Sequence, residues 1–385
     1  MTEVPLGSLI RPAKVSRAGD REFPLLSMTM HHGLVEQSTR FKKRIASTDL
    51  STYKVVNRGQ LVVGFPIDEG VLDFQEVHPA GIVSPAYGVW DVIDERQIDR
   101  RYLKLALRSP QAFTYYKTKL RGSTARRRSL PADVFLSLPV RLPPLSEQRR
   151  IATILDYADS LRTKRRQILT HLDSLAAATF IDMFGDPLTN SRNISKATIG
   201  SFTDVVTGNS PSRADSANFG NTIEWIKSDN LGKMIATQAD ESLSQQGRTK
   251  ARVAPTGSIL VTCIAGSPRS IGKSSLVDRD VAFNQQINAI LPSPDIHPLF
   301  LLSQLKTAPE LVQEKSTGGM KGLVSKSSFQ AIEVLFPPMS EQEKFATRMG
   351  CITKQIGHFL RMLTIEEELF ISLQAQAFSH SVVHL

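Results

Sequence analysis

The chain has 385 residues, of which 41% are hydrophobic and 22% are charged, values typical of a globular protein. It carries 47 lysines and arginines against 37 aspartates and glutamates, so its formal net charge is +10. No apolar run approaches the roughly 20 residues that a membrane span needs, and the start at Met1 lacks the features of a signal peptide. We therefore expect a cytoplasmic protein with no membrane segment, and the excess of cations favours a polyanionic partner such as nucleic acid.

A six-residue phrase, Pro-Pro-x-Ser-Glu-Gln, occurs at residues 143–148 and again at residues 337–342. Each copy follows a block of similar length and opens a stretch with helical periodicity, and Ala-Thr recurs in the same register at residues 152–153 and 346–347. The order block, helix, block, helix indicates an internal duplication with two globular heads.

Both helical stretches carry apolar residues at alternating three- and four-residue steps, the spacing of a coiled-coil seam. Arg165 interrupts the first seam and Glu366 the second. The prolines cannot lie inside a helix, so Ser146 and Ser340 are expected to cap helices that start just after them. The seam residues are Ile151, Ile154, Ala158, Leu161, Ile168, Leu172 and Leu175, then Phe345, Met349, Ile352, Ile356, Phe359, Leu363, Phe370 and Leu373.

The chain order predicts that the two helices pack antiparallel, since the second can bury its seam only by returning along the first. About 36 residues at ~1.5 Å each would extend for roughly 50 Å, the scale of one to two turns of duplex DNA. A scaffold or oligomerisation role would explain the same heptads. Gly350 should weaken the second helix by about 1 kcal/mol relative to alanine.

The heads combine α and β features. Short β-like runs lie at residues 60–65, 81–84 and 87–92 of the first head and at 257–262 and 284–290 of the second, between turn residues. A basic segment, with Arg121 and the run 126–128, suits phosphate contact, although a solvated loop would have the same composition.

No catalytic constellation is visible. Residues 266–274 come nearest to a phosphate-binding loop. However, five residues rather than four separate Gly266 from the Gly272-Lys273 pair, and Pro268 lacks one of the backbone N–H groups that would bind phosphate. The eight histidines show no metal spacing, and no methyltransferase Asn-Pro-Pro segment, glycine-rich cofactor loop or hydrolase elbow is present. Cys263 and Cys351 are too few for a disulfide scaffold or a zinc site, so each is expected to be a small buried hydrophobe. The chain is therefore predicted to be non-catalytic and metal-free.

The repeated phrase and its helix, together with residues 183–187, 199–200, 223–227 and 257–260, resemble the specificity subunit of type I restriction-modification systems. The resemblance covers nearly the whole chain and is better in the second half. It implies an α+β fold in which two mixed α/β target recognition domains are separated by an antiparallel two-helix coiled-coil spacer. The expected parts are a first recognition domain at 1–142, a first spacer helix at 143–185, a second domain at 186–336, and a second spacer helix with a tail at 337–385.

The first head lacks a counterpart of the Trp225 segment, and residues 27–32 are expected to take its place. Residue type and loop position give the candidate DNA-binding residues, because arginine and lysine suit guanine while asparagine and glutamine suit adenine. They are His31, His32, Arg121, Arg126, Arg127, Arg128, Lys227, Ser228, Asp229, Asn230, Arg269, Lys273, Asn284, Gln285 and Gln286. A polar strand edge would equally explain residues 284–286, and solvated surface would explain Arg269 and Lys273. The predicted partner-binding residues of the spacer are Ser146, Glu147, Gln148, Ile151, Ser340, Glu341, Gln342 and Phe345.

The function implied by the resemblance is recognition of an asymmetric, bipartite site in double-stranded DNA, in defence against foreign DNA. Two methyltransferase subunits would methylate adenine with S-adenosylmethionine, and restriction subunits that translocate DNA would use ATP and Mg2+; this chain would bind none of these cofactors. Two alternatives stay open: the specificity subunit of a type II enzyme with a bipartite site, and a coiled-coil adaptor that does not bind DNA.

Overall fold

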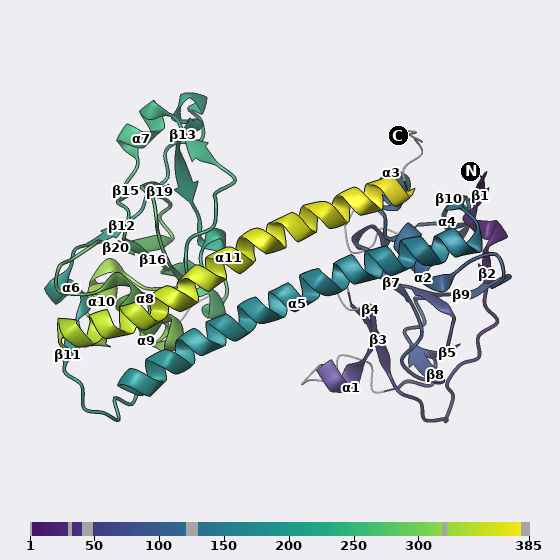
Figure 1. The fold of residues 1–385 in the computed structure, drawn as a ribbon, viewed down its shortest axis with the longest axis horizontal. Helices are drawn as coiled ribbons and strands as arrows, with labels where there is room; N and C mark the ends of the chain where they lie inside the picture. Colours follow the sequence, from purple (N-terminus) through teal and green to yellow (C-terminus); the bar gives the residue numbers. More distant parts are fainter. Residues whose placement is uncertain (1, 30–32, 41–48, 121–129, 318–321, 379–385) are drawn as a thin grey trace. The chain divides into compact units, whose positions relative to one another are not determined.

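The computed structural model describes residues 2–29, 33–40, 49–120, 130–317 and 322–378 (Figure 1). The chain divides into two compact units. The first unit is Met1–Lys164 with Leu363–Leu385, and the second is Arg165–Met362. Both divisions fall inside the long helices, so each unit contains one predicted recognition domain and a part of each helix.

The first unit is built on a four-stranded antiparallel sheet of order β2-β9-β6-β7, with β1-β10, β3-β4 and β5-β8 as two-stranded pairs. Its strands are β1 (Thr2–Pro5), β2 (Ile10–Pro12), β3 (Leu26–Thr29), β4 (Gly33–Glu36), β5 (Lys54–Asn57), β6 (Leu61–Val63), β7 (Leu72–Phe74), β8 (Ala80–Val83), β9 (Gly88–Val92) and β10 (Pro139–Leu142). Its short helices are α1 (Gln37–Arg40), α2 (Arg100–Leu107), α3 (Pro110–Lys119) and α4 (Ala132–Leu136).

The second unit repeats this plan around a four-stranded sheet of order β12-β20-β16-β18. It also contains a second four-stranded sheet, of order β14-β13-β19-β15. Its strands are β11 (Lys196–Thr198), β12 (Val205–Thr207), β13 (Phe219–Ile226), β14 (Ser242–Leu243), β15 (Val253–Ala254), β16 (Ile259–Thr262), β17 (Ile264–Ala265), β18 (Ser274–Leu276), β19 (Val281–Phe283), β20 (Ile287–Ile290), β21 (Gly322–Leu323) and β22 (Glu333–Leu335). Its short helices are α6 (Ile199–Phe202), α7 (Gln245–Lys250), α8 (Pro298–Thr307), α9 (Glu310–Gln313) and α10 (Lys326–Gln330).

The strand registers confirm the duplication. Leu61 pairs with Trp90 in the first sheet as Ile259 pairs with Ile290 in the second. The turns before β6 and β16 also agree, because Gly59 and Gly257 adopt φ values of 89° and 85°, a left-handed conformation that glycine accepts without strain. Residues 284–286, expected to begin a strand, instead form the turn before β20.

The two long helices are α5 (Leu145–Phe184) and α11 (Met339–Phe378). They begin earlier than predicted, because the carbonyl of Pro144 already accepts from the backbone N–H of Gln148 at 3.0 Å. Ser146 and Ser340 therefore lie in the first turn and do not cap the helices. Gly185, at φ 77°, ends α5, and α11 continues through Gly350.

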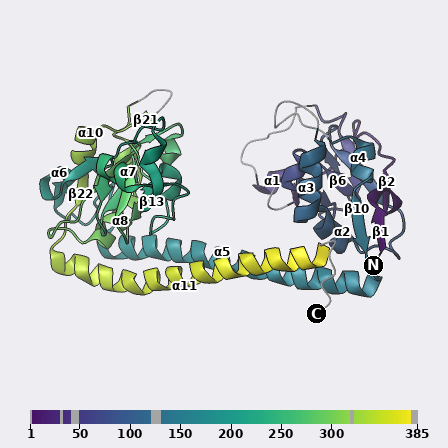
Figure 2. The same ribbon diagram turned by 90° about the horizontal axis from the view of Figure 1, so that it is seen from above.

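Within each unit, part of α5 lies alongside the opposite end of α11 (Figures 1 and 2). In the first unit Ile151 and Ala158 share a buried cluster with Phe370 and Phe378; in the second, Phe180 shares one with residues of the first turns of α11. This arrangement confirms the antiparallel pairing within both units.

The predicted seam is correct at most positions but wrong at two. Ile154 and Leu175 are 38% and 50% exposed, while the next residues, Leu155 and Ala176, are buried. Near the ends of α5 the buried face also covers the globular part of its unit, so it is wider than a heptad stripe. Arg165, the charged seam residue, places its guanidinium carbon 5.1 Å from the ring centre of Phe359.

The two cysteines differ in environment. Cys263 is buried, as predicted, and burial raises the pKa of its thiol to about 12. Cys351 is exposed on α11, so the prediction of burial is wrong for that residue.

Candidate nucleic-acid interface

The glutamine of the repeated phrase fastens the start of each long helix to its unit. Gln148 is fully buried; its Oε1 accepts from the N–H of Asp99 at 2.8 Å, and its Nε2 donates to the carbonyls of Gln97 and Pro143, both at 2.9 Å. Asp99 is the N-cap of α2, so one side chain joins the starts of two helices.

Gln342 repeats this contact in the second unit. Its Oε1 accepts from the N–H of His297, the N-cap of α8, at 2.8 Å, and its Nε2 donates to the carbonyl of Pro337 at 2.9 Å. The glutamine is thus the part of the phrase that the fold itself requires.

Burial narrows the predicted partner-binding set. Gln148, Ile151, Gln342 and Phe345 pack inside their own units, so their side chains present no surface to a partner. The other four, Ser146, Glu147, Ser340 and Glu341, are exposed or half-exposed, and partner binding stays a prediction for them. Both glutamates form ion pairs with the residue three positions on, at 2.7 Å in each case.

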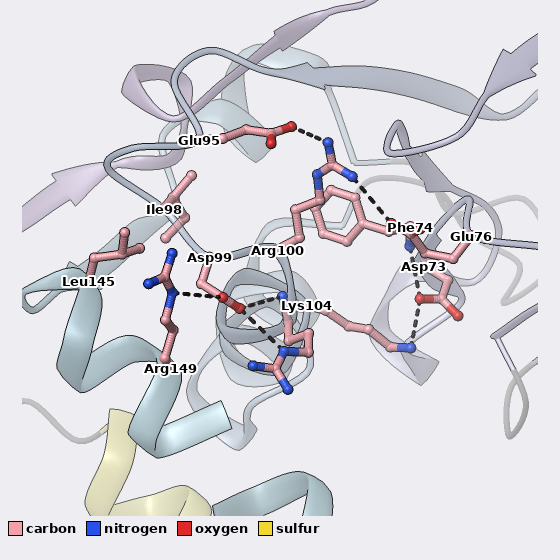
Figure 3. Close-up of a pocket in the computed structure, with 11 residues that line it drawn as sticks. Asp73, Phe74, Glu76, Glu95, Ile98, Asp99, Arg100, Lys104, Leu145 and Arg149 are labelled. Carbon is pink, nitrogen blue, oxygen red and sulfur yellow. Dashed lines mark hydrogen bonds and ion pairs between the residues drawn. The ribbon is translucent and has the colours of Figure 1, made fainter. Parts of the chain in front are cut away.

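The first unit has a cavity of about 500 Å³ beside the start of α5 (Figure 3). Its charged side chains pair with one another across the cavity: Lys104 Nζ lies 2.7 Å from Asp73 Oδ1, and Arg100 pairs with Glu76 and Glu95. The positive charges that line the cavity are therefore largely neutralised by acidic side chains of the same lining, and the lining leaves no unpaired cation to bind phosphate.

In the second unit, two parallel strands bring the main group of candidates together. β13 and β19 are parallel neighbours, with Ile226 paired to Phe283, although more than fifty residues separate them in the sequence. Residues 227–230 and 284–286 follow directly on these strands, so both groups lie at the same carboxyl edge. The N–H of Asn284 donates to the carbonyl of Ile226 at 3.1 Å, which holds the two groups in contact.

A hydrogen-bonded network joins three of these candidates. Asn284 Oδ1 accepts from the N–H of Gln286 at 3.1 Å, and Asn284 Nδ2 donates to Gln286 Oε1, also at 3.1 Å. Ser228 Oγ donates to the same Oε1 at 3.3 Å. Asn284 is only 7% exposed and therefore orients its neighbours, whereas Gln286 is half-buried and Gln285 is exposed.

Two further polar residues of the 227–230 segment, Asn230 and Asp229, have different environments. The side chain of Asn230 closes its own turn, because Oδ1 accepts from the N–H of Lys227 at 2.9 Å and Nδ2 donates to the carbonyl of Gln238 at 2.9 Å. Asp229 is exposed.

Lys227 belongs to a cationic group around Trp225 that sequence reasoning missed in part. Lys227 Nζ lies 2.7 Å from Glu241 Oε1, and Arg213 Nη2 lies 2.8 Å from Glu241 Oε2. Both cations lie over the indole, at 5.3 Å and 5.6 Å from its centre. The pKa of Glu241 is lowered, mainly by the hydrogen bond from Lys227. Arg213 and Glu241 could not be found from the sequence, because no local pattern joins either of them to Lys227.

Two further residues that were not predicted from the sequence, Asn209 and Ser210, lie at the same carboxyl edge of β13 and β19. The N–H of Asn209 donates to the carbonyl of Phe283 at 3.1 Å, and its Oδ1 accepts from the N–H of Arg252 at 2.7 Å. Ser210 hydrogen-bonds to Gln285. The Gly-Asn-Ser turn after β12 is the only signal that marks them in the sequence.

Arg269 and Lys273 lie in the loop between β17 and β18, with Arg269 in a single 3-10 turn. The loop departs from the same edge, because the N–H of Ile264 donates to the carbonyl of Gln286 at 3.1 Å. Both side chains are exposed, and neither forms a hydrogen bond or ion pair with any residue that the structure describes. Phosphate contact stays a prediction for both residues.

The remaining candidates, His31, His32, Arg121, Arg126, Arg127 and Arg128, lie outside the described residues. In the first unit, Leu25 forms a parallel bridge with Ile82, just as Trp225 pairs in parallel with Ala282 in the second unit. Leu25 therefore corresponds to Trp225. Two and three residues further on, Ser27 and Met28 correspond to Lys227 and Ser228. This position agrees with the segment predicted to replace the Trp225 region.

The part of the chain that the structure describes contains no group of three histidine, cysteine, aspartate or glutamate side chains placed to hold a metal ion. None of the helices formed by the described residues has an apolar stretch of the length that a membrane span requires.

Residues 192–358 match the family described as the type I restriction modification DNA specificity domain. The chain is similar to type I specificity subunits over this segment. The HindI specificity subunit of Haemophilus influenzae is 28% identical over 139 residues, which cover 34% of this chain and 29% of that protein. The MjaIX specificity subunit of Methanocaldococcus jannaschii is 23% identical over 177 residues, 44% of this chain and 40% of that protein. The chain thus spans less than half the length of either specificity subunit.

Solved structures extend the likeness in fold to the whole chain. The specificity subunit from M. genitalium superimposes with a TM-score of 0.58 at 12% identity, covering 99% of this chain and 96% of that one. A chain from a study of complex assembly and conformational transition in a type I system gives 0.52 at 16% identity, covering 99% and 98%. These matches confirm the predicted α+β fold of the specificity subunits.

Proposed function

We propose that this chain is the DNA-recognition subunit of a type I restriction-modification complex, and that its two units each contact one part of an asymmetric bipartite site. The observation that carries the proposal is the match of residues 192–358 to a DNA specificity domain. The duplicated fold supports it further, since two related units suit a split site.

The chemistry of the second unit is consistent with this role. Its carboxyl edge presents amide and hydroxyl groups, which can bond to base edges in a groove. Arg269 and Lys273 beside them pair with no residue that the structure describes, and exposed cations of this kind neutralise phosphates. Base contacts would supply specificity, and phosphate contacts would supply affinity and register.

Catalysis would belong to partner subunits. In this proposal two methyltransferase subunits bring S-adenosylmethionine and methylate adenine, while restriction subunits bring ATP and Mg2+. Large apolar side chains lie exposed on the long helices of the first unit, including Tyr157 at 66%, Ile365 at 56% and Leu369 at 51%. Such exposure on a helix surface suits a docking face for these subunits.

The test is to map methylated adenines by single-molecule sequencing in a host that expresses this chain with its methyltransferase subunit, and in a host that lacks only this chain. A split motif present in the first host and absent from the second would support the proposal. Identical methylation in the two hosts, when the co-purified complex also fails to bind duplex DNA, would contradict it.

A further inference from the structure

The side chain of Gln286 has a fixed orientation that determines which base edge it can contact. We infer that Gln286 reads a guanine, through the two hydrogens of its Nε2, at one position of the DNA segment contacted by the second unit. The inference rests on the proposed function and goes beyond it, because it names a specificity-determining residue and the base that it selects.

The orientation follows from a backbone group that can only donate. The N–H of Gln286 lies 3.1 Å from the side chain of Asn284, so the atom of Asn284 that faces it must be Oδ1. The other end of the same amide, Nδ2, then faces Gln286, and because Nδ2 is also only a donor, the Gln286 atom 3.1 Å away must be Oε1.

A second donor occupies the remaining position on this oxygen. Ser228 Oγ lies 3.3 Å from Gln286 Oε1 and donates to it. A carbonyl oxygen has two lone pairs, and both are now engaged inside the protein. Nε2, with its two hydrogens, has no hydrogen-bond partner among the residues that the structure describes, so it is the group left to bind a ligand.

A donor-only amide does not suit adenine. The usual glutamine-adenine pair needs the glutamine oxygen to accept from the adenine N6 amino group while nitrogen donates to N7. Guanine presents two acceptors, N7 and O6, on its major-groove edge, which match two N–H donors. The network therefore reverses the preference for adenine that residue type alone predicts for Gln286.

The same turn in the first unit cannot read a base in this way. Val89 and Ala289 occupy equivalent positions in the two sheets, because each is paired with the second residue of its neighbouring strand, Val62 of β6 or Leu260 of β16. Counting back three residues places Ala86 where the second unit has Gln286, and alanine has no side-chain donor. A change at Gln286 should thus alter one half of the DNA site only.

In the experiment, the full chain in complex with its methyltransferase subunits is incubated with a pool of DNA duplexes in which the site is randomised. The methylated products are then sequenced. The wild type should select guanine over adenine by roughly tenfold or more at one position of one half-site. Gln286→Met, which removes both hydrogens at similar volume, should reduce that preference to about onefold and leave the other positions unchanged.

Asn284→Asp provides the sharper variant. A carboxylate can only accept, so the amide of Gln286 should turn its Nε2 inward and present Oε1. The preferred base at that position should change from guanine to one that carries an amino donor, adenine or cytosine. Gln245→Met is the matched control: this exposed glutamine lies on α7, which packs at the amino end of β13, and it should leave every position unchanged.

The outcomes separate this inference from the proposed function. If wild type selects a split motif but Gln286→Met keeps every preference, or if the position that responds is not guanine, the inference is overturned while the proposed function stands. If wild type selects no motif, the proposed function itself fails. Should Asn284→Asp prevent assembly, the comparison of Gln286→Met with Gln245→Met still decides the question.

Discussion

The buried glutamines at the starts of α5 and α11 should be strong and unequal sources of stability. Gln148→Met keeps the side-chain volume but removes three hydrogen bonds, leaving an N–H and two carbonyls without partners. Gln342→Met removes two. Each such loss costs ~1–3 kcal/mol, and the lower value applies here because some of these bonds are only partly buried. We expect the free energy of unfolding to fall by about 3 kcal/mol for the first variant and about 2 kcal/mol for the second.

The chain offers a direct assay, because its two tryptophans lie one in each unit. Trp90 is in the core of the first unit and Trp225 in a core cluster of the second, and both are buried. Urea unfolding followed by fluorescence in a Trp225→Phe background reports the first unit, and a Trp90→Phe background reports the second. Gln148→Met should lower the midpoint of the first transition, and Gln342→Met that of the second.

Ser146→Ala, in the exposed first turn of α5, is the control and should change stability by less than about 0.5 kcal/mol. If Gln148→Met is as mild as this control, the glutamine does not fasten the helix, and the account of the repeated phrase is refuted.

Three further predictions concern charge and accessibility. Glu241→Gln should release its two cationic partners, raise affinity for non-specific duplex DNA and steepen its salt dependence, as measured by fluorescence anisotropy; unchanged binding would contradict the site. Hydrogen bonds from Arg279 lower the pKa of Glu224 below its ordinary value of 4.5, so their stabilisation is complete above that pH and is lost as pH falls through the lowered pKa. Glu224→Gln should therefore flatten the acid side of the second unit's stability curve, and an unchanged curve would refute the assignment. A thiol reagent should modify Cys351 in the native protein and Cys263 only after unfolding; native labelling of both would contradict the buried position.

The sequence predicted the long helices well because prolines and heptads are local signals. The paired prolines limit where each helix can start, and the apolar spacing shows which face is buried. The exceptions, Ile154 and Leu175, occur where the helix packs against the globular part of its unit, and a heptad pattern contains no information about that contact.

The candidate site was predicted only in part, because long-range pairing assembles it. Lys227 and Gln286 could be named from residue type, but nothing local shows that β13 and β19 lie side by side and in parallel. The same pairing decides which side chains orient others: Asn284 was expected to read a base, yet its burial and its bonds make it a support for Gln286.

Exchange of one recognition segment would show whether each unit reads its own part of a bipartite DNA site. Residues 191–335 would be replaced by the corresponding segment of a specificity subunit with a known, different target, and methylated motifs would be sequenced in the host. One half of the motif should change to that of the donor, while the other half stays as in the wild type. A change in both halves, or in neither, would contradict it.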